Sequence, residues 1–317
     1  MSNKLQRAWL ATAVWFGLNS FGIASFIVRF PDVKQALDIS NSSLGAALFT
    51  GSLGTLVTIR FAGKFCARFG SAPVMVVGAV AMAAMLPIAS ILANYATFIL
   101  SLCFLMSAIT LMDVSMNAHA VTIEHESGKL IMGRLHGLWS VGGIVGGFSG
   151  GLCASLGVSL QRQGLLVGVV TLLVGLFFRT FLLPASDDIH EPEEAAEKTS
   201  RNPRIFYMLG AVGLCAAIIE GSAGDWGAVL ITDDFGATGL ISSLPYIVFQ
   251  TAMVIGRFSS DALTTRYGRA SILLGCGLLA AIGLSAGLVI GGQVAIDRKS
   301  TRLNSSHTDI SRMPSSA

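Results

Sequence analysis

The sequence predicts an all-α membrane protein with nine transmembrane helices. Hydrophobic residues make up 53% of the 317 residues and charged residues only 12%, whereas a soluble domain is about one quarter charged. The hydrophobic residues gather in runs near the roughly 20 residues that a helix needs to cross a bilayer. The net charge of +3 is small. We therefore expect the lipid bilayer as a partner and no nucleic acid.

Nine apolar runs define the expected helices. The second and eighth runs are short, and we expect both helices to extend into their flanks. The first run, after Arg7, is too long for the apolar core of a signal peptide and has no cleavage pattern, so we count it as a helix. The runs cover residues 8–28, 44–59, 73–92, 96–118, 137–156, 164–183, 205–223, 240–255 and 271–291.

The positions of lysine and arginine predict the orientation. With a cytoplasmic N-terminus, fourteen basic residues fall on the inner side and three on the outer side. This bias follows the positive-inside rule. The inner set is Lys4, Arg7, Arg60, Lys64, Arg68, Lys129, Arg134, Arg179, Lys198, Arg201, Arg204, Arg257, Arg266 and Arg269, and the outer set is Arg29, Lys34 and Arg162.

The chain repeats itself around a charged connector. Residues 60–73 and 258–271 align without gaps at an offset of 198 residues, each after the second helix of its half. Parallel repeats of six helices are typical of the major facilitator fold. We therefore expect a six-helix bundle over residues 1–184, a cytoplasmic linker over 185–204, and three helices of a second bundle over 205–296.

The apolar pattern stops near residue 297. Residues 297–317 are polar and aperiodic, and they resemble the translated read-through of a sequencing adapter. We interpret this tail as non-native and the chain as C-terminally truncated. Resequencing the locus is expected to reveal three further apolar spans in its place.

The turn over residues 63–71 resembles the signature loop of major facilitators, which reads roughly G-x-x-x-D-R-x-G-R-R. The resemblance implies a cytoplasmic gate, weakened in the first half because Ala67 stands where the family has aspartate. A basic turn that only anchors the orientation is the alternative. The matching residues are Gly63, Arg68 and Gly70 in the first half, and Arg266, Gly268 and Arg269 in the second.

Ionisable residues within the expected spans are candidates for proton coupling. A charge at the centre of a membrane helix costs about 2.5–3.5 kcal/mol even on the lenient insertion scale, so such residues are usually functional. Because burial disfavours the charged form of a carboxyl group, an intramembrane carboxylate suits proton binding and release. Glu220 is the first candidate, Asp113 the second and His136 the third. Each has a structural alternative, as a hydrogen-bonded packing residue.

Polar and aromatic residues within the spans are candidates for a central cavity that binds a solute. They are Trp15, Asn19, Asn117, Trp139 and Gln250. We expect Trp226, in contrast, to lie in the aromatic belt near the outer surface. Glycines at every fourth position of the fifth helix, in two rows from residue 142 to residue 151, predict close packing against a neighbouring helix. In major facilitators such a run marks a contact between the two halves.

Three motifs strengthen the resemblance. They are NA-x-x-V-x-x-E at 117–124, HG-x-W-S at 136–140 and EGSA-x-DW at 220–226. They resemble the bacterial branch of the major facilitators that includes the inner-membrane protein YbjJ and the rhizopine transport protein MosC. The resemblance implies a monomeric secondary transporter in the bacterial inner membrane. The resemblance names a family and not a substrate. From the fold and the intramembrane carboxylates together we expect a small polar solute that moves by alternating access, coupled to protons and without a cofactor.

Two other classes of function remain open. A membrane sensor or scaffold on the same fold would carry a long ordered cytoplasmic domain, and the short linker over 185–204 argues against it. A membrane-embedded enzyme would need a converging nucleophile, base or metal cluster. The sequence has no HExxH, GxSxG or clustered His/Cys pattern, so we expect neither catalytic residues nor a metal site.

Overall fold

The computed structural model describes residues 2–188, 203–268, 270–283, 285–287 and 289. Most of the expected linker, Arg269 of the signature loop and the expected tail over 297–317 lie outside these residues. Nine helices in the described part are long and apolar enough to cross a membrane. The predicted number of spans and the all-helical class are therefore confirmed.

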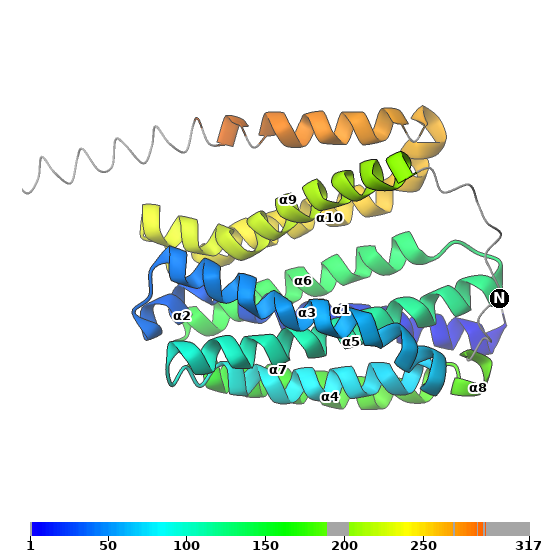
Figure 1. Cartoon of the computed structure of the whole chain (residues 1–317), viewed down its shortest axis with the longest axis horizontal. Coiled ribbons are helices and arrows are strands. Elements are labelled where there is room, and N and C mark those ends of the chain that lie inside the picture. The colour runs from blue at the N-terminus through cyan, green and yellow to red at the C-terminus, as the bar shows by residue number, and fades with distance from the viewer. Residues whose placement is uncertain (1, 189–202, 269, 284, 288, 290–317) are drawn as a thin grey trace, which may run out of the picture. The chain divides into compact units, whose positions relative to one another are not determined.

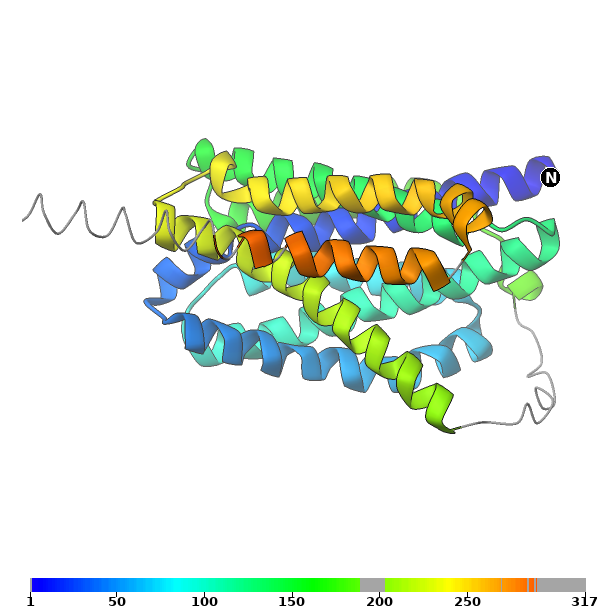
Figure 2. The same cartoon turned by 90° about the horizontal axis from the view of Figure 1, so that it is seen from above.

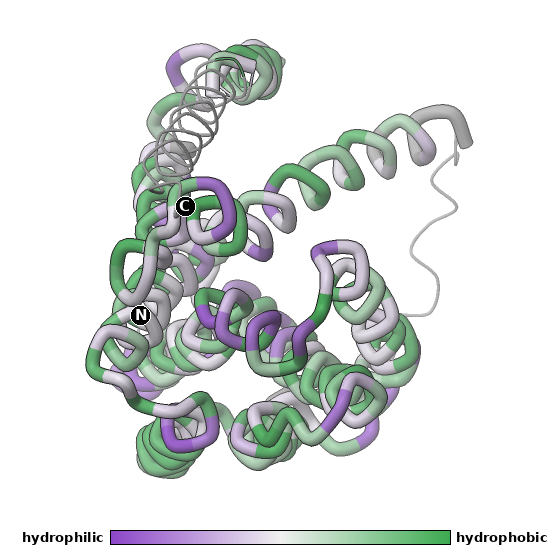
Figure 3. The backbone as a smooth tube through the Cα atoms, turned by 90° about the vertical axis from the view of Figure 1, so that its left-hand side faces the viewer, coloured by the Kyte–Doolittle hydropathy of each residue, from purple (hydrophilic) through white to green (hydrophobic). Residues whose placement is uncertain are grey.

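The long helices α1 and α3 to α7 run side by side (Figure 1). Hydrophobic residues dominate them, and hydrophilic residues gather at several of the turns between them (Figure 3). A compact unit extends to Phe258, and a second unit contains the end of α10 and a helix over Ala270–Gly287. The labelled elements are α1 (Asn3–Ile27), α2 (Phe30–Leu37), α3 (Asn41–Phe69), α4 (Ser71–Ala89), α5 (Tyr95–Ser127), α6 (Met132–Ser155), α7 (Leu160–Phe178), η1 (Arg179–Phe181), α8 (Ala185–Asp188), α9 (Pro203–Phe235) and α10 (Leu240–Tyr267).

Four helices are longer than their apolar runs. α3, α5, α9 and α10 end at residues 69, 127, 235 and 267, where we expected ends at 59, 118, 223 and 255. Helical hydrogen bonding does not stop where polar side chains begin. Each of these helices is instead followed by a glycine with positive φ, a conformation that is costly for other residues. These glycines are Gly70, Gly128, Gly236 and Gly268.

Arg29, which we assigned to the outer side, is buried at 4% exposure. Its guanidinium donates to Asp32 at 2.8 Å and to Gln163 Oε1 at 2.5 Å. A third bond reaches the carbonyl of Val158 at 3.2 Å. Arg29 thus ties α1 to α2, a short helix that the apolar pattern missed, and to the α6–α7 turn and the start of α7.

The glycines of α6 pack on two neighbours. Gly142, Gly146 and Gly150 face the backbone of α1, and a Cβ atom built on Gly146 would lie 2.5 Å from the carbonyl oxygen of Phe21. Gly143, Gly147 and Gly151 face α10. Their Cβ atoms would approach Gln250, Tyr246 and Leu240 within 3.0–3.2 Å. The predicted close packing is present on both faces, and the second face joins the six-helix bundle to α10.

Replacing Gly146 by alanine is expected to destabilise the protein by about 1–3 kcal/mol, the usual cost of overpacking. The clash is with backbone of α1, which cannot rotate away as a side chain can. Gly133 lies in the same helix with nothing within 4 Å of a built Cβ atom. Gly133→Ala is therefore the matched control, and it is expected to stabilise the helix slightly. Thermal unfolding of both variants in detergent measures the difference, and equal unfolding temperatures would contradict the packing argument.

Candidate functional site

Arg257 is the central residue of a polar cluster between α6, α9 and α10. Its Nη1 donates to the carbonyl oxygen of His136 at 3.0 Å and to Ser140 Oγ at 2.5 Å. Its Nη2 pairs with Glu220 Oε1 at 3.5 Å. The side chain of Arg257 is 22% exposed and that of Glu220 is 42% exposed. A single guanidinium therefore links α6 of the first bundle to α9, while remaining accessible.

Arg257 lies farther inside its helix than we predicted. We assigned it to the inner side because its apolar run ended at 255, but α10 continues to Tyr267 and keeps Arg257 well inside the helix. Glu220, on α9, has the opposite charge. Pairing the two offsets part of the cost of holding each charge away from water. Two opposite charges on adjacent spans could have predicted this ion pair. The predicted helix end at residue 255 hid it, because it placed Arg257 outside the span.

Trp139 and Asn19 complete one wall of this cluster. The indole Nε1 of Trp139 donates to Asn19 Oδ1 at 3.1 Å, and the amide of Asn19 donates to the carbonyl oxygen of Ile109 at 3.2 Å. The guanidinium of Arg257 lies over the Trp139 ring, 5.5 Å from its centroid. This cation–π contact and the hydrogen bond fix the indole between a cation and an amide.

Gln250 lies in α10, two turns from Arg257 towards the start of the helix. Its amide nitrogen donates to the Tyr246 hydroxyl at 3.2 Å, and the side chain is buried at 2% exposure. Its Oε1 has no hydrogen-bond partner in the described part of the chain. A buried acceptor without a donor is costly. The absence of a side chain at Gly143 leaves the space that Gln250 fills.

The remaining expected site residues make contacts of other kinds. Asn117 donates to the carbonyl oxygen of Asp113 at 2.9 Å within α5, which confirms only that they share a face. The ring of Trp15 packs against Gly175 of α7 and is 1% exposed. His136 stacks edge-on against Phe16 with ring centroids 5.3 Å apart. Of the candidate residues, the structure joins Glu220, His136, Trp139 and Asn19 through contacts to Arg257 or to one another.

The two signature loops share their local geometry. Arg68 stacks over the ring of Phe69, and Arg266 over that of Tyr267, each 5.3 Å from the ring centroid. Gly70 and Gly268 follow with φ of +82° and +79°. Gly63, in contrast, lies within α3 with nothing within 4 Å of a built Cβ atom. The loop is thus a single-residue turn between α3 and α4, and the repeat extends to its backbone conformation.

A second polar contact lies at the opposite end of the helices, where α1 ends. Lys34 of α2 forms an ion pair with Asp233 of α9. Asn41, at the start of α3, donates to the same carboxylate at 3.0 Å. Trp226 also lies near this end, and its indole packs against Gly45 of α3. Trp226 therefore contacts the first bundle, and α9 extends beyond it to Phe235, so the expected helix end before it was wrong.

Comparison with known proteins identifies the family. The family model described as the Major Facilitator Superfamily matches residues 12–297. An uncharacterized MFS-type transporter of Yersinia pestis is 29% identical over 289 residues, which cover 90% of this chain and 73% of that protein. The membrane protein MosC of Rhizobium meliloti is 27% identical over 279 residues, or 88% of this chain and 67% of MosC.

Solved structures support the same fold. The crystal structure of the nucleoside transporter NupG aligns with a TM-score of 0.62 at 13% identity, covering 84% of this chain and 69% of NupG. The repeat, the nine spans and the family match agree with this likeness. The chain is a membrane transporter protein that belongs to the Major Facilitator Superfamily.

Proposed function

We propose that the protein is a proton-coupled secondary transporter of a small polar solute that works by alternating access. Its N-terminus is cytoplasmic and its membrane is the bacterial inner membrane. The ion pair between Glu220 and Arg257 is the observation that carries this proposal. It places a titratable carboxylate beside a fixed cation at the contact between the two bundles.

Protonation of Glu220 would neutralise its charge and end the ion pair. Arg257 would keep its bonds to α6 through Nη1, but its Nη2 would lose the carboxylate of α9. The link between α6 and α9 would then weaken whenever a proton binds. A proton can in this way change the relative stability of the states that open to either side, which is the requirement for coupling.

The contacts between the bundles differ along the membrane normal. At the end that we assign to the outside, Lys34, Asn41 and Asp233 join α2, α3 and α9. α9 runs obliquely to α10 (Figure 2), and its described residues from 210 to 219, towards the cytoplasmic end, are exposed. The contacts at the outer end support a state that is closed on that side.

The side chains of the cluster support a polar solute with an apolar face. The Trp139 ring offers a flat apolar face, the partly exposed Glu220 can bind an amine, and Asn19 and Gln250 carry amides. A sugar-like or amine-bearing solute would match these groups. Nucleosides, the solutes named for the structurally similar NupG, belong in the first panel to be tested.

The test is transport by the full-length protein, with the three further spans that we expect, in proteoliposomes with an imposed pH gradient. A panel of sugars, amines, amino acids and nucleosides is added outside, and a pH-sensitive dye records the proton flux inside. One class of solute is expected to move protons and to accumulate against its own gradient. If no solute moves protons, proton coupling is wrong. If a solute equilibrates without accumulating, the protein is a passive carrier.

A further inference from the structure

The short helix α2 connects α1 to α3 at the end of the bundle that we assign to the outside (Figure 1). Its Lys34 forms the ion pair with Asp233 of α9, so α2 carries one side of a contact between the two bundles. α2 has only eight residues, Phe30–Leu37. A helix of this length is not stable by itself in water. Its position therefore depends on contacts with the rest of the first bundle.

Arg29, directly before α2, makes four of these contacts. Its Nε and Nη2 donate to the Asp32 carboxylate at 2.8 and 3.3 Å, and its Nη1 donates to Gln163 Oε1 at 2.5 Å. Nη2 also donates to the carbonyl oxygen of Val158 at 3.2 Å. Gln163 is 3% exposed and donates in turn to the carbonyl oxygen of Ser25 at 2.6 Å. This buried network fastens the first turn of α2 to α1, to α7 and to the turn between α6 and α7.

Apolar contacts fix the rotation of α2 about its own axis. Phe30 is 1% exposed and Val33 is fully buried. The ring of Phe30 meets that of Phe26 edge-on, with centroids 5.8 Å apart. Lys34 follows Val33 directly and lies one turn after Phe30, so it emerges beside the buried face of the helix. The backbone at Lys34 is therefore held in place before its side chain meets any partner.

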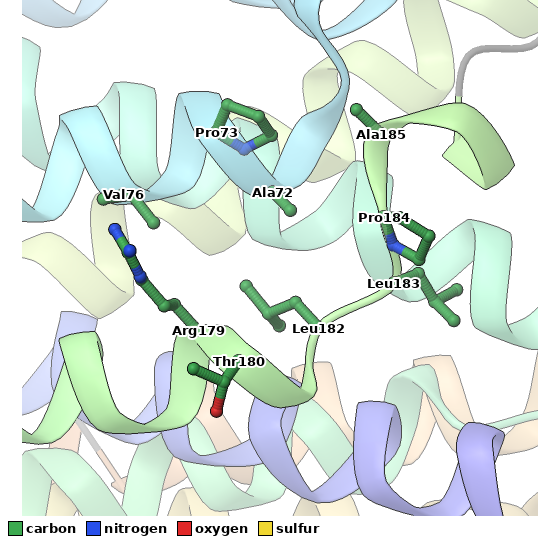
Figure 4. A pocket seen from close by; sticks show the side chains of 9 residues that line it. All are labelled: Ala72, Pro73, Val76, Arg179, Thr180, Leu182, Leu183, Pro184 and Ala185. Atoms are coloured by element: carbon green, nitrogen blue, oxygen red, sulfur yellow. The ribbon is translucent and has the colours of Figure 1, made fainter.

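Burial distinguishes Arg29 from the two arginines at the ends of α7. Arg162, near the start of α7, is exposed. Arg179, directly after α7, is exposed as well, and Figure 4 shows its side chain extending towards Val76 beside a cavity of about 530 Å³. Replacing an exposed arginine usually changes stability little. Replacing Arg29 removes the donor to a carboxylate and to a buried amide, which is costly.

We propose that Arg29 is a positioning residue for closure of the outer end. An exposed ion pair usually contributes little, because two flexible side chains lose their freedom when they pair. Holding one partner in place beforehand reduces this cost. Arg29 makes α2 a rigid arm of the first bundle, so that Lys34 meets Asp233 whenever the outer end closes. The outer end then opens by separation of the bundles and not by bending of α2. This inference rests on the proposed alternating access and orientation.

The test is labelling of Ser242→Cys by a water-soluble maleimide in membrane vesicles that contain the full-length protein. Ser242 is 6% exposed and lines a cavity of about 420 Å³ that Lys34 also lines. Mass spectrometry of the peptide that contains residue 242 gives the rate. Arg29→Gln is expected to raise this rate about fivefold, the most that loss of one such ion pair can give. In the Asp233→Asn protein, which already lacks the pair, Arg29→Gln is expected to add almost nothing.

The two backgrounds separate positioning from a general loss of stability. A looser protein would be labelled faster by the same factor with Asp233 and with Asn at 233, and that result would overturn the proposal. An unchanged rate in Arg29→Gln would overturn it as well. Arg162→Gln and Arg179→Gln are the controls, and both are expected to leave the rate unchanged.

Ala36→Gly tests the rigidity of α2 without touching the buried network, and it decides the question if Arg29→Gln does not fold. Ala36 is exposed, and glycine loosens a helix, so labelling at 242 is expected to rise about twofold when Asp233 is present. Gln35→Ala, at the exposed neighbouring position, is the matched control and is expected to change nothing. An unchanged rate in Ala36→Gly would mean that α2 need not be rigid. Labelling requires neither solute nor a pH gradient, so its outcome is independent of the transport test.

Discussion

The Glu220→Gln variant is expected to lose solute accumulation driven by a pH gradient. Each pH unit can drive about tenfold accumulation when one proton moves with one solute molecule. Glutamine keeps the size of the side chain but binds no proton, so the accumulation ratio should fall to one. Exchange of labelled for unlabelled solute needs no net proton movement and is expected to persist. Both are measured in proteoliposomes with equal amounts of protein.

Asp225→Asn is the matched control for this experiment. Asp225 lies on α9 five residues from Glu220 and is also partly buried, but it forms no ion pair with Arg257. We expect this variant to accumulate solute as the wild type does. Undiminished accumulation by Glu220→Gln would exclude Glu220 as the proton carrier. Asp113, hydrogen-bonded to Asn117 within α5, would then be the next carboxylate to test.

The stability of the same variants reports on the ion pair. Glu220→Gln removes the carboxylate that pairs with Nη2 of Arg257, while the bonds from Nη1 to α6 remain. Losing the opposite charge beside a partly buried guanidinium is costly. The double variant Glu220→Gln/Arg257→Gln is therefore expected to be more stable than the single variant Glu220→Gln. Equal unfolding temperatures in detergent would mean that solvent screens the pair and that it contributes nothing to stability.

Much of the fold could be predicted from the sequence because membrane helices follow local rules. An apolar run, a basic flank and a repeat at a fixed offset are each visible within a short stretch of residues. Helix ends were the exception. They depend on single glycines such as Gly70 and Gly268, and the lengths of the apolar runs take no account of these residues. This error moved Arg257 from the middle of α10 to a loop.

The site was less predictable, because it depends on contacts between distant segments. Glu220 stood out since a carboxylate within an apolar run is rare. Its partner Arg257 was missed because the predicted helix end placed it outside the span. Lys34 and Asp233 are 199 residues apart, and each looked like an ordinary charge at a membrane surface. Their pairing reflects which helices meet, and no short motif encodes that.

Reversing the charge of Lys34 is expected to open the outer end of the transporter. Lys34→Asp places two carboxylates together where an ion pair now joins α2 to α9. Ser242, which is 6% exposed, lines the cavity beneath this pair. We expect a cysteine at 242 to react with a water-soluble maleimide about tenfold faster in the Lys34→Asp protein, because loss of attraction and new repulsion add.

The compensating variant decides whether the pair itself closes this end. Lys34→Asp/Asp233→Lys restores opposite charges at the same positions. The rate of labelling at 242 should therefore return close to the rate in the protein that keeps Lys34 and Asp233. Arg162→Asp reverses an exposed charge at the same end of the helices without touching the pair, and it should leave the rate unchanged. Fast labelling in the double variant would mean that the outer end is held by apolar packing, such as Trp226 against Gly45, and not by charge. Lys34 and Asp233 belong to different bundles. Slow labelling at 242 in the double variant would therefore mean that their ion pair holds the two bundles together at this end.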